Sequence, residues 1–146
     1  MFLGAMFQTF DAPTFPEQGP PRLEALRAAM AAEGLDAFLV PRADRHQGEY
    51  VAPADERLAW LTGFTGSAGF AAVTRDIAGV FVDGRYRLQA RNQVADVFTP
   101  VDWPETKLGP WLKEHLDAGA VVGFDPWLHT KDEIDAIRKA AGEHLV

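Results

Sequence analysis

Residues 70–82 read FAAVTRDIAGVFV, and this stretch says more than any other about the fold class. Two apolar runs, Phe70–Thr74 and Ile77–Val82, are separated only by the pair Arg75-Asp76. Strand-forming residues on both sides of so short a polar break are typical of a β-hairpin. The sequence therefore predicts two adjacent antiparallel strands near the middle of the chain.

Further strands and helices are predicted on both sides of this hairpin. Short apolar runs predict buried strands at residues 37–40, 97–101 and 120–124. Pro100 places its strand near an edge of the sheet, because proline cannot donate a hydrogen bond to the ladder. Apolar residues at helical spacing, with helix-forming composition, predict helices at residues 20–33, 56–61, 85–94, 108–116 and 131–141.

Local signals fix several of the helix ends. Gly34 follows the first helix where a C-cap is expected, and Thr130 with Glu133 forms the sequence pattern of a capping box. The last residues, His144–Val146, resemble the start of one more strand. Strands that alternate with helices, together with one hairpin, predict an α/β fold with a mixed β-sheet flanked by helices.

Length and composition indicate a single globular domain. The chain has 146 residues, of which 47% are hydrophobic and 24% charged, enough for one core and not for two. Residues 1–19 are expected to be a leader segment and residues 20–146 the domain. Phe7, Phe10 and Phe15 suggest that the leader lies across the surface of the domain.

Charge and cysteine content exclude several classes of function. A net charge of −7, without a basic run, argues against nucleic-acid or anionic-membrane partners. The absence of cysteine excludes disulfides, thiol nucleophiles and cysteine-ligated metals. No stretch approaches the roughly 18 apolar residues of a membrane span, and the start lacks the basic residues of a signal peptide. A cytoplasmic protein is expected.

The glycine-rich segment at residues 63–69 matches no phosphate-binding or nucleophile motif. It lacks the Gly-Lys-Ser/Thr ending of a P-loop, and its G-x-x-G-x-x-G spacing differs from the dinucleotide fingerprint. Ser67 follows Gly66 directly, so the nucleophile-elbow pattern fails by one residue. A tight turn with close backbone packing is the expected role.

Two polar strings are the candidates for a binding site. Asp44, His46, Glu49 and Tyr50 lie in a loop after the first strand, without the spacing of a metal site. Their alternative role is a hydrogen-bonded loop. The remaining histidines are interpreted as structural: His115 as packed and hydrogen-bonded, and His129 as a surface residue.

The second string is Asp83-Gly84-Arg85-Tyr86, at the end of the second hairpin strand. In α/β sheets ligands gather at the carboxyl ends of strands. Arg85 could hold a carboxylate with two hydrogen bonds and Tyr86 could donate one. The local alternative is that Asp83 caps the following helix and pairs with Arg85.

Tryptophans complete the set of notable side chains. Helical spacing places Trp111 in the core, whereas Trp103 and Trp127 adjoin prolines in connecting segments. For these two, packing against the domain is the first interpretation and an exposed subunit or domain contact is the second. No catalytic dyad, triad or metal set can be assembled from the sequence.

Taken together, these strings resemble the long form of aminopeptidase P. Residues 44–53 resemble its D-x-H-Q-S-E-Y-x-A-P loop, with Gly48 in place of serine. Residues 61–69 are similar to its S-G-F-x-G-S-A-G segment, residues 82–90 to T-D-G-R-Y-x-L-Q-A, and residues 122–126 to V-G-x-D-P. The likeness covers about residues 23–146.

The resemblance implies a creatinase/prolidase N-terminal domain, with a ribonuclease H-like motif, belonging to a hydrolase that removes the residue before a proline at the second position of a peptide. In that family two metal ions, commonly manganese, sit in a C-terminal catalytic domain, so no catalytic residue and no metal are expected in this chain. It is predicted inactive alone. The implied partners are its own catalytic domain, further copies of the enzyme and proline-containing peptides.

Two alternatives remain from the sequence. One is the N-terminal domain of a prolidase or creatinase-type hydrolase, against which the H-Q-x-E-Y loop speaks. The other, from a different class, is a stand-alone interaction module. Under the aminopeptidase hypothesis, the site candidates at the substrate entrance are Asp44, His46, Glu49, Tyr50, Arg85 and Tyr86.

Overall fold

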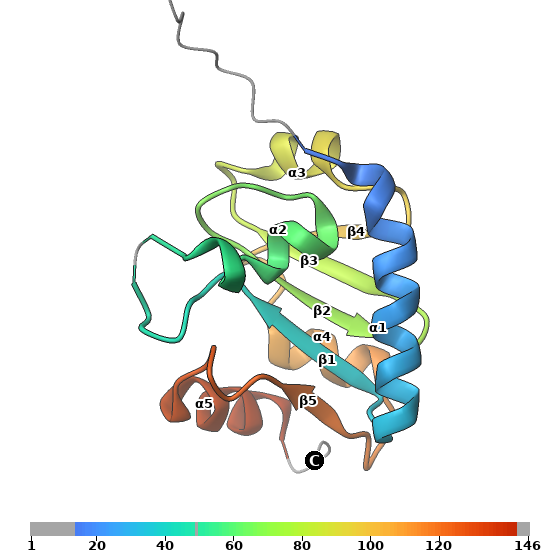
Figure 1. Cartoon of the computed structure of the whole chain (residues 1–146). Coiled ribbons are helices and arrows are strands. Elements are labelled where there is room, and N and C mark those ends of the chain that lie inside the picture. Colours follow the sequence, from blue (N-terminus) through green and yellow to red (C-terminus); the bar gives the residue numbers. More distant parts are fainter. Residues whose placement is uncertain (1–13, 49, 143–146) are drawn as a thin grey trace, which may run out of the picture.

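The predicted hairpin lies within a five-stranded mixed sheet (Figure 1). The computed structural model describes residues 14–48 and 50–142. The sheet has the order β4-β3-β2-β1-β5. Its strands are β1 (Ala37–Pro41), β2 (Phe70–Thr74), β3 (Ala78–Val82), β4 (Thr99–Asp102) and β5 (Val122–Phe124). The α/β class and the mixed sheet are confirmed, and Pro100 lies on an edge strand as expected.

The strand directions bring five connecting segments to one edge of the sheet. β2 is antiparallel to β1 and β3, while β5 is parallel to β1 and β4 is parallel to β3. Four strands therefore point the same way, and β2 begins where they end. We call this side the carboxyl edge. It gathers the segments that follow β1, β3, β4 and β5 and the segment that precedes β2.

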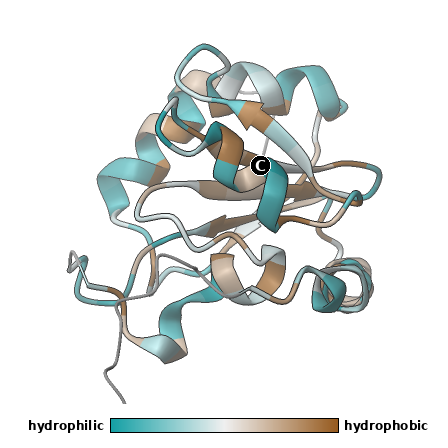
Figure 2. Cartoon of the chain, turned by 90° about the horizontal axis from the view of Figure 1, so that it is seen from above, coloured by the Kyte–Doolittle hydropathy of each residue, from teal (hydrophilic) through white to brown (hydrophobic). Residues whose placement is uncertain are grey.

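Helices cover both faces of the sheet (Figures 1 and 2). They are α1 (Gly19–Glu33), α2 (Arg57–Thr62), α3 (Arg87–Gln93), α4 (Leu108–His115) and α5 (Lys131–Ala141), with short 3₁₀ turns η1 (Pro16–Gln18) and η2 (Pro53–Asp55). α1 and α2 lie on one face, and α4 lies on the other (Figure 1). Among the described residues, no helix is long and apolar enough to cross a membrane.

Alternating residues of the strands belong to two hydrophobic clusters, one on each face of the sheet. Val73 and Val80 belong to the cluster under α1 and α2, whereas Ala72 and Phe81 belong to the cluster with Trp111 of α4. Side chains of successive strand residues point to opposite faces, so buried strands supply both clusters. Figure 2 shows the hydrophobic residues concentrated in the central strands.

The local end signals behave as predicted. Gly34 ends α1 in the left-handed conformation at φ 71°. The hydroxyl of Thr130 accepts from the backbone of Glu133, and the Glu133 carboxylate accepts from the backbone of Thr130, which confirms the capping box. The expected strand at 144–146 and most of the leader lie outside the described residues.

The exposure of the tryptophan side chains corrects part of the first interpretation. Trp127 is 73% exposed and Trp103 is 41% exposed, while Trp111 is buried as expected. Trp103 and Trp127 follow β4 and β5 in connecting segments. Packing against the domain is therefore the wrong interpretation for Trp127, whereas Trp103 is partly packed and partly exposed.

Candidate functional site

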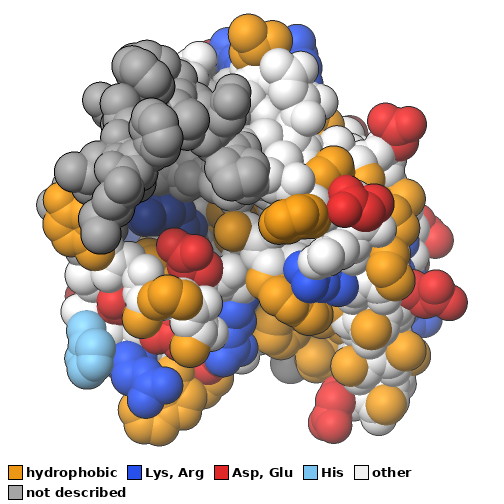
Figure 3. All heavy atoms as spheres, turned by 45° about the horizontal axis from the view of Figure 1, so that its top comes forward, with side chains coloured by type: hydrophobic (Ala, Val, Ile, Leu, Met, Phe, Trp, Pro, Cys, Tyr) orange, Lys and Arg blue, Asp and Glu red, His pale blue; other side chains and the backbone are white. Residues whose placement is uncertain are grey.

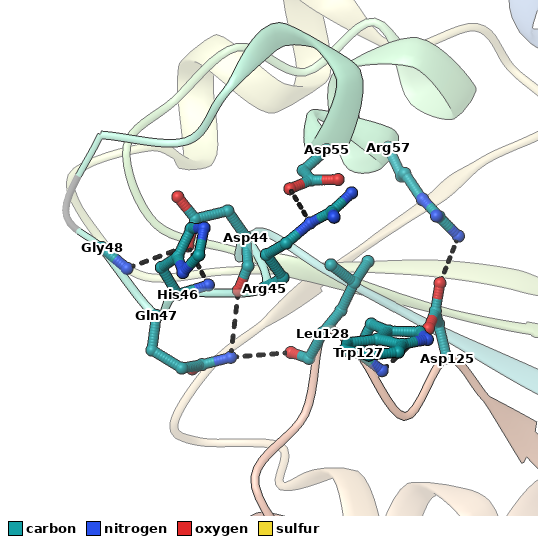
Figure 4. Close-up of polar contacts among 10 residues, drawn as sticks. All are labelled: Asp44, Arg45, His46, Gln47, Gly48, Asp55, Arg57, Asp125, Trp127 and Leu128. Atoms are coloured by element: carbon teal, nitrogen blue, oxygen red, sulfur yellow. Dashed lines mark hydrogen bonds and ion pairs between the residues drawn. The ribbon is translucent and has the colours of Figure 1, made fainter.

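The loop after β1 is organised around a buried carboxylate (Figure 4). Asp44 is only 6% exposed. Its Oδ1 accepts hydrogen bonds from the backbone N–H of His46 at 2.8 Å and of Gly48 at 3.0 Å. These bonds, the one from Gly48 first, lower the pKa of the Asp44 carboxyl, because they stabilise its charged form. Asp44 therefore fixes the backbone of residues 44–48 through hydrogen bonds to its side chain.

Gln47 fastens the same loop to the segment after β5. It adopts φ 54°, an unusual conformation for a non-glycine residue. Its Nε2 donates to the Leu128 carbonyl at 3.1 Å and to the Asp44 carbonyl at 3.3 Å (Figure 4). An ion pair also joins α2 to the segment after β5, because Arg57 Nη1 lies 2.6 Å from Asp125 Oδ2. Two neighbouring segments of the carboxyl edge are thus linked.

The turn after β3 is held by a local ion pair. Asp83 Oδ1 accepts from the Arg85 backbone N–H at 2.9 Å, and Asp83 Oδ2 accepts from Arg85 Nη2 at 2.8 Å. The Arg85 side chain, hydrogen-bonded to Asp83, lowers the pKa of that carboxyl. The pairing expected from the sequence is confirmed, but Asp83 does not cap a helix, because α3 begins only at Arg87.

Tyr86 connects this turn to the glycine-rich segment. Its hydroxyl hydrogen-bonds the Ser67 hydroxyl, and its ring packs edge-on against Phe64 at a centroid distance of 5.7 Å. The hydrogen bond with Ser67 is the main cause that lowers the pKa of Tyr86. Gly66 is buried against both rings, so the expected close backbone packing is observed there.

The structure places the predicted site residues in two groups on the carboxyl edge. Asp44, His46 and Tyr50 belong to the loop after β1, and Arg85 with Tyr86 belongs to the turn after β3. His46 is exposed, and Tyr50 is 88% exposed. No hydrogen bond or ion pair joins the two groups among residues 14–48 and 50–142. Glu49 lies outside the described residues.

A cavity of about 500 Å³ opens along the same edge. Segments that follow β1, β4 and β5 line it together with the start of β2, and most of the lining is apolar. Gln47 and Arg42 contribute polar groups, while Phe70 and Trp103 contribute aromatic surface. Concave, largely apolar surfaces with a few polar groups are typical of binding sites.

His129 corrects another expectation, because its side chain is only 8% exposed. The ring packs edge-on against Phe124, and Nδ1 lies 3.6 Å from Glu133 Oε2. Nε2 is buried without a hydrogen-bond partner among the described residues. Burial lowers the pKa of His129, since the charged imidazolium is poorly solvated there. His115, in contrast, is hydrogen-bonded to the Trp111 carbonyl as expected, yet remains exposed.

We expect the chain to lose stability as the pH falls below about 6.5, the ordinary pKa of histidine. The unfolded chain binds a proton at His129 in that range and the folded chain resists it, so acid favours unfolding. Urea unfolding at pH 7.5 and pH 5.5 measures the effect. His129→Gln should show a smaller difference between the two pH values, with exposed His46→Gln as the control. If the His129→Gln variant lost as much stability between pH 7.5 and pH 5.5 as the parent chain, His129 would not be the group responsible.

Three features of the site escaped sequence reasoning. The Gln47–Leu128 bond spans 81 positions, and the Ser67–Tyr86 bond spans 19. The ion pair between Arg57 and Asp125 also joins residues that are far apart in the sequence. Gln47, Ser67, Tyr86 and Asp125 all lie in the segments that resemble the family, but nothing in those segments shows which residues contact each other.

The described residues do not form a metal centre. Among residues 14–48 and 50–142, no three His, Asp or Glu side chains are grouped so that they could hold a metal ion. The side chains described at the carboxyl edge offer hydrogen bonding, ion pairing and apolar contact. Such groups bind and orient a ligand.

Sequence comparison finds a matching family and relatives that are aminopeptidases. Residues 22–146 match the family described as the creatinase/prolidase N-terminal domain. Aminopeptidase P1 of Lotus japonicus is 42% identical in an alignment of 113 residues that covers 72% of this chain and 16% of that protein. Human Xaa-Pro aminopeptidase 2 is 42% identical in an alignment of 116 residues that covers 75% of this chain and 16% of the relative. The chain thus spans about one sixth of their length.

Solved structures agree with the sequence matches. X-prolyl aminopeptidase from Caenorhabditis elegans, described as a cytosolic enzyme with a di-nuclear active site, superposes with a TM-score of 0.78 and 33% identity. The match covers 88% of this chain and 23% of that enzyme. The N-terminal domain of the cytoplasmic peptidase PepQ from Mycobacterium tuberculosis gives a TM-score of 0.62 and 31% identity, over 86% of this chain and 88% of that domain.

Proposed function

Because the chain belongs to the creatinase/prolidase N-terminal domain family, we propose that it is the non-catalytic N-terminal domain of a metal-dependent Xaa-Pro aminopeptidase. The observation that carries this proposal is the 42% identity to two such aminopeptidases, over 16% of the length of each. The proposed enzyme removes the first residue of peptides that have proline in second position.

The remaining parts of the proposal concern the whole enzyme. The chemistry belongs to a C-terminal catalytic domain with two divalent metal ions, for which manganese is the proposed metal. When bound, such a pair supplies a metal-activated water as nucleophile. The enzyme is proposed to be cytoplasmic and homo-oligomeric, and this domain to contact the catalytic domain and help shape the entrance of its active site.

The carboxyl edge supports a role in positioning peptide substrates. Its loops are fixed by internal hydrogen bonds, so they need little further ordering when a ligand arrives. Arg85 is held by Asp83 in one orientation, 5.1 Å from the Tyr86 ring, but its side chain is still 67% exposed. An oriented and accessible guanidinium is suited to hold a carboxylate.

In the full-length enzyme, Arg85→Ala should lower kcat/KM for Xaa-Pro peptides about tenfold, as expected for one lost charge-assisted hydrogen bond. Steady-state kinetics with a peptide that has a free carboxyl terminus gives this value. Arg91→Ala, a change at an exposed arginine of α3, is the matched control. Unchanged kinetics in a folded Arg85→Ala enzyme would contradict the positioning role.

A further inference from the structure

An apolar groove opens on the face of the sheet that carries α1 and α2. Its volume is about 240 Å³. We call it the Trp60 groove, after the aromatic residue of α2 in its lining. Other apolar side chains that line it come from α1, β1, α2 and the segment after β5 and include Leu26, Phe38, Val40, Leu61 and Leu128. Figure 3 shows a hollow in the surface with hydrophobic and basic side chains around it. Apolar walls accept many ligands, so the polar groups decide which kind of ligand fits.

The aromatic side chain of the groove is held in place while it is still accessible. The guanidinium carbon of Arg22 lies 4.5 Å from the centroid of the Trp60 ring, and Arg22 Nη1 donates to the Trp60 carbonyl at 2.5 Å. Trp60 nevertheless remains 55% exposed. A ring fixed in advance loses little conformational freedom when a ligand packs on it. Trp60 therefore offers a prepared aromatic surface.

The polar side chains that line the groove offer hydrogen-bond donors rather than acceptors. The indole of Trp60 and the guanidinium of Arg57 can only donate. In the described part of the chain, Trp60 Nε1 and the Nε and Nη2 atoms of Arg57 have no hydrogen-bond partner. Asp125 is the one carboxylate among the described lining residues. Its Oδ1 already accepts from the backbone N–H of Trp127 at 2.9 Å, and its Oδ2 lies 2.6 Å from Arg57 Nη1.

This set of groups favours a peptide that brings acceptors without donors. An ordinary peptide presents one N–H and one C=O at each residue, and an N–H that leaves water in this groove would gain no acceptor. Proline has no backbone N–H and carries an apolar ring. A run of prolines therefore brings only carbonyl acceptors and apolar surface. Such a run is already ordered as a polyproline II helix, the form in which proline-rich segments dock in aromatic-lined grooves.

We propose that the Trp60 groove binds a proline-rich peptide segment in the polyproline II conformation. The proline rings pack on Trp60 and the apolar walls, while peptide carbonyls accept hydrogen bonds from the Trp60 indole and from Arg57. The ligand is a run of adjacent prolines, and not the single proline in second position that the proposed reaction requires. This inference concerns binding by this chain alone and does not depend on the catalytic activity of a longer protein.

Titration of the 146-residue chain with a blocked peptide of six prolines, followed by NMR, tests the proposal. The chain has 4 tryptophans, and the Trp60→Phe variant identifies the indole N–H signal of Trp60. That signal and the Arg57 Nε–H signal should shift together and reach saturation as the peptide is added. The indole signals of Trp103 and Trp111, which do not line the groove, should stay in place.

Two substitutions test the role of the donors. Trp60→Phe keeps an aromatic ring and removes the indole N–H, so Kd followed at the Arg57 Nε–H signal should rise about fivefold, as for one lost hydrogen bond. Trp103→Phe, the same change at another partly exposed tryptophan, should leave Kd unchanged. In the peptide, replacement of two central prolines by alanine restores two N–H groups and should weaken binding at least as much. An unchanged Trp111 indole signal verifies that each variant is folded.

Four results would each overturn the proposal. The first is that neither the Trp60 nor the Arg57 signal moves with the proline peptide. The second is equal affinity for the proline and alanine-containing peptides, since the lack of peptide N–H groups would then be irrelevant. The third is an unchanged Kd in Trp60→Phe. The fourth is a Trp60 signal that shifts with the concentration of the chain alone, which would make a second copy the occupant of the groove.

Discussion

Phe81→Ala is expected to lower the free energy of unfolding of this chain by about 3–5 kcal/mol, the usual cost of removing a buried phenylalanine ring. Phe81 is fully buried in β3. Its ring stacks on the Phe70 ring at a centroid distance of 4.6 Å and packs edge-on against the Trp111 ring at a centroid distance of 5.4 Å. Truncation therefore leaves a cavity and removes the contacts that join the sheet to α4.

Urea denaturation followed by circular dichroism measures this loss. Native domains of this size are typically stable by about 5–15 kcal/mol, so the variant should unfold at much lower urea. Leu88→Ala removes an apolar side chain that is 73% exposed, and it should change stability by no more than about 0.5 kcal/mol. A Phe81→Ala chain as stable as the control would contradict the described core.

The elements of the fold were largely predictable, because their signals are local. The hairpin follows from two apolar runs and a short polar break, and the last helix follows from Thr130, Glu133 and its apolar spacing. Boundaries differ by a residue or two where long-range pairing sets them. Ile77, for example, was predicted to be in the strand, but its carbonyl closes the turn by accepting from Thr74 N at 2.7 Å, so β3 begins at Ala78.

The candidate site was predictable only in part. Asp44 and Asp83 contact residues two to four positions away, so these contacts could be expected from the local sequence. Contacts between loops depend on strand order, which the sequence does not display. His129 is expected at the surface because it precedes the capping Thr130, but Phe124 of β5 packs against its ring and the side chain is buried.

The largest effect concerns activity. We expect hydrolysis of an Xaa-Pro peptide by the full-length enzyme and only the uncatalysed rate in the presence of the 146-residue chain. Enzymes accelerate such reactions by about 10⁶-fold or more, and a metal-activated water is the proposed nucleophile. The relatives are about six times longer than the matched segment, which leaves room for a separate catalytic domain. The carboxyl edge would then bind and orient peptides without cleaving them.

The assay that tests this account most directly measures release of the first residue from an Xaa-Pro peptide with added Mn²⁺, for the chain and for the full-length protein in parallel. Activity in the full-length protein alone is the predicted result. Cleavage by the 146-residue chain itself would show that a catalytic site lies within it. The absence of cleavage by both would contradict the assignment to an Xaa-Pro aminopeptidase.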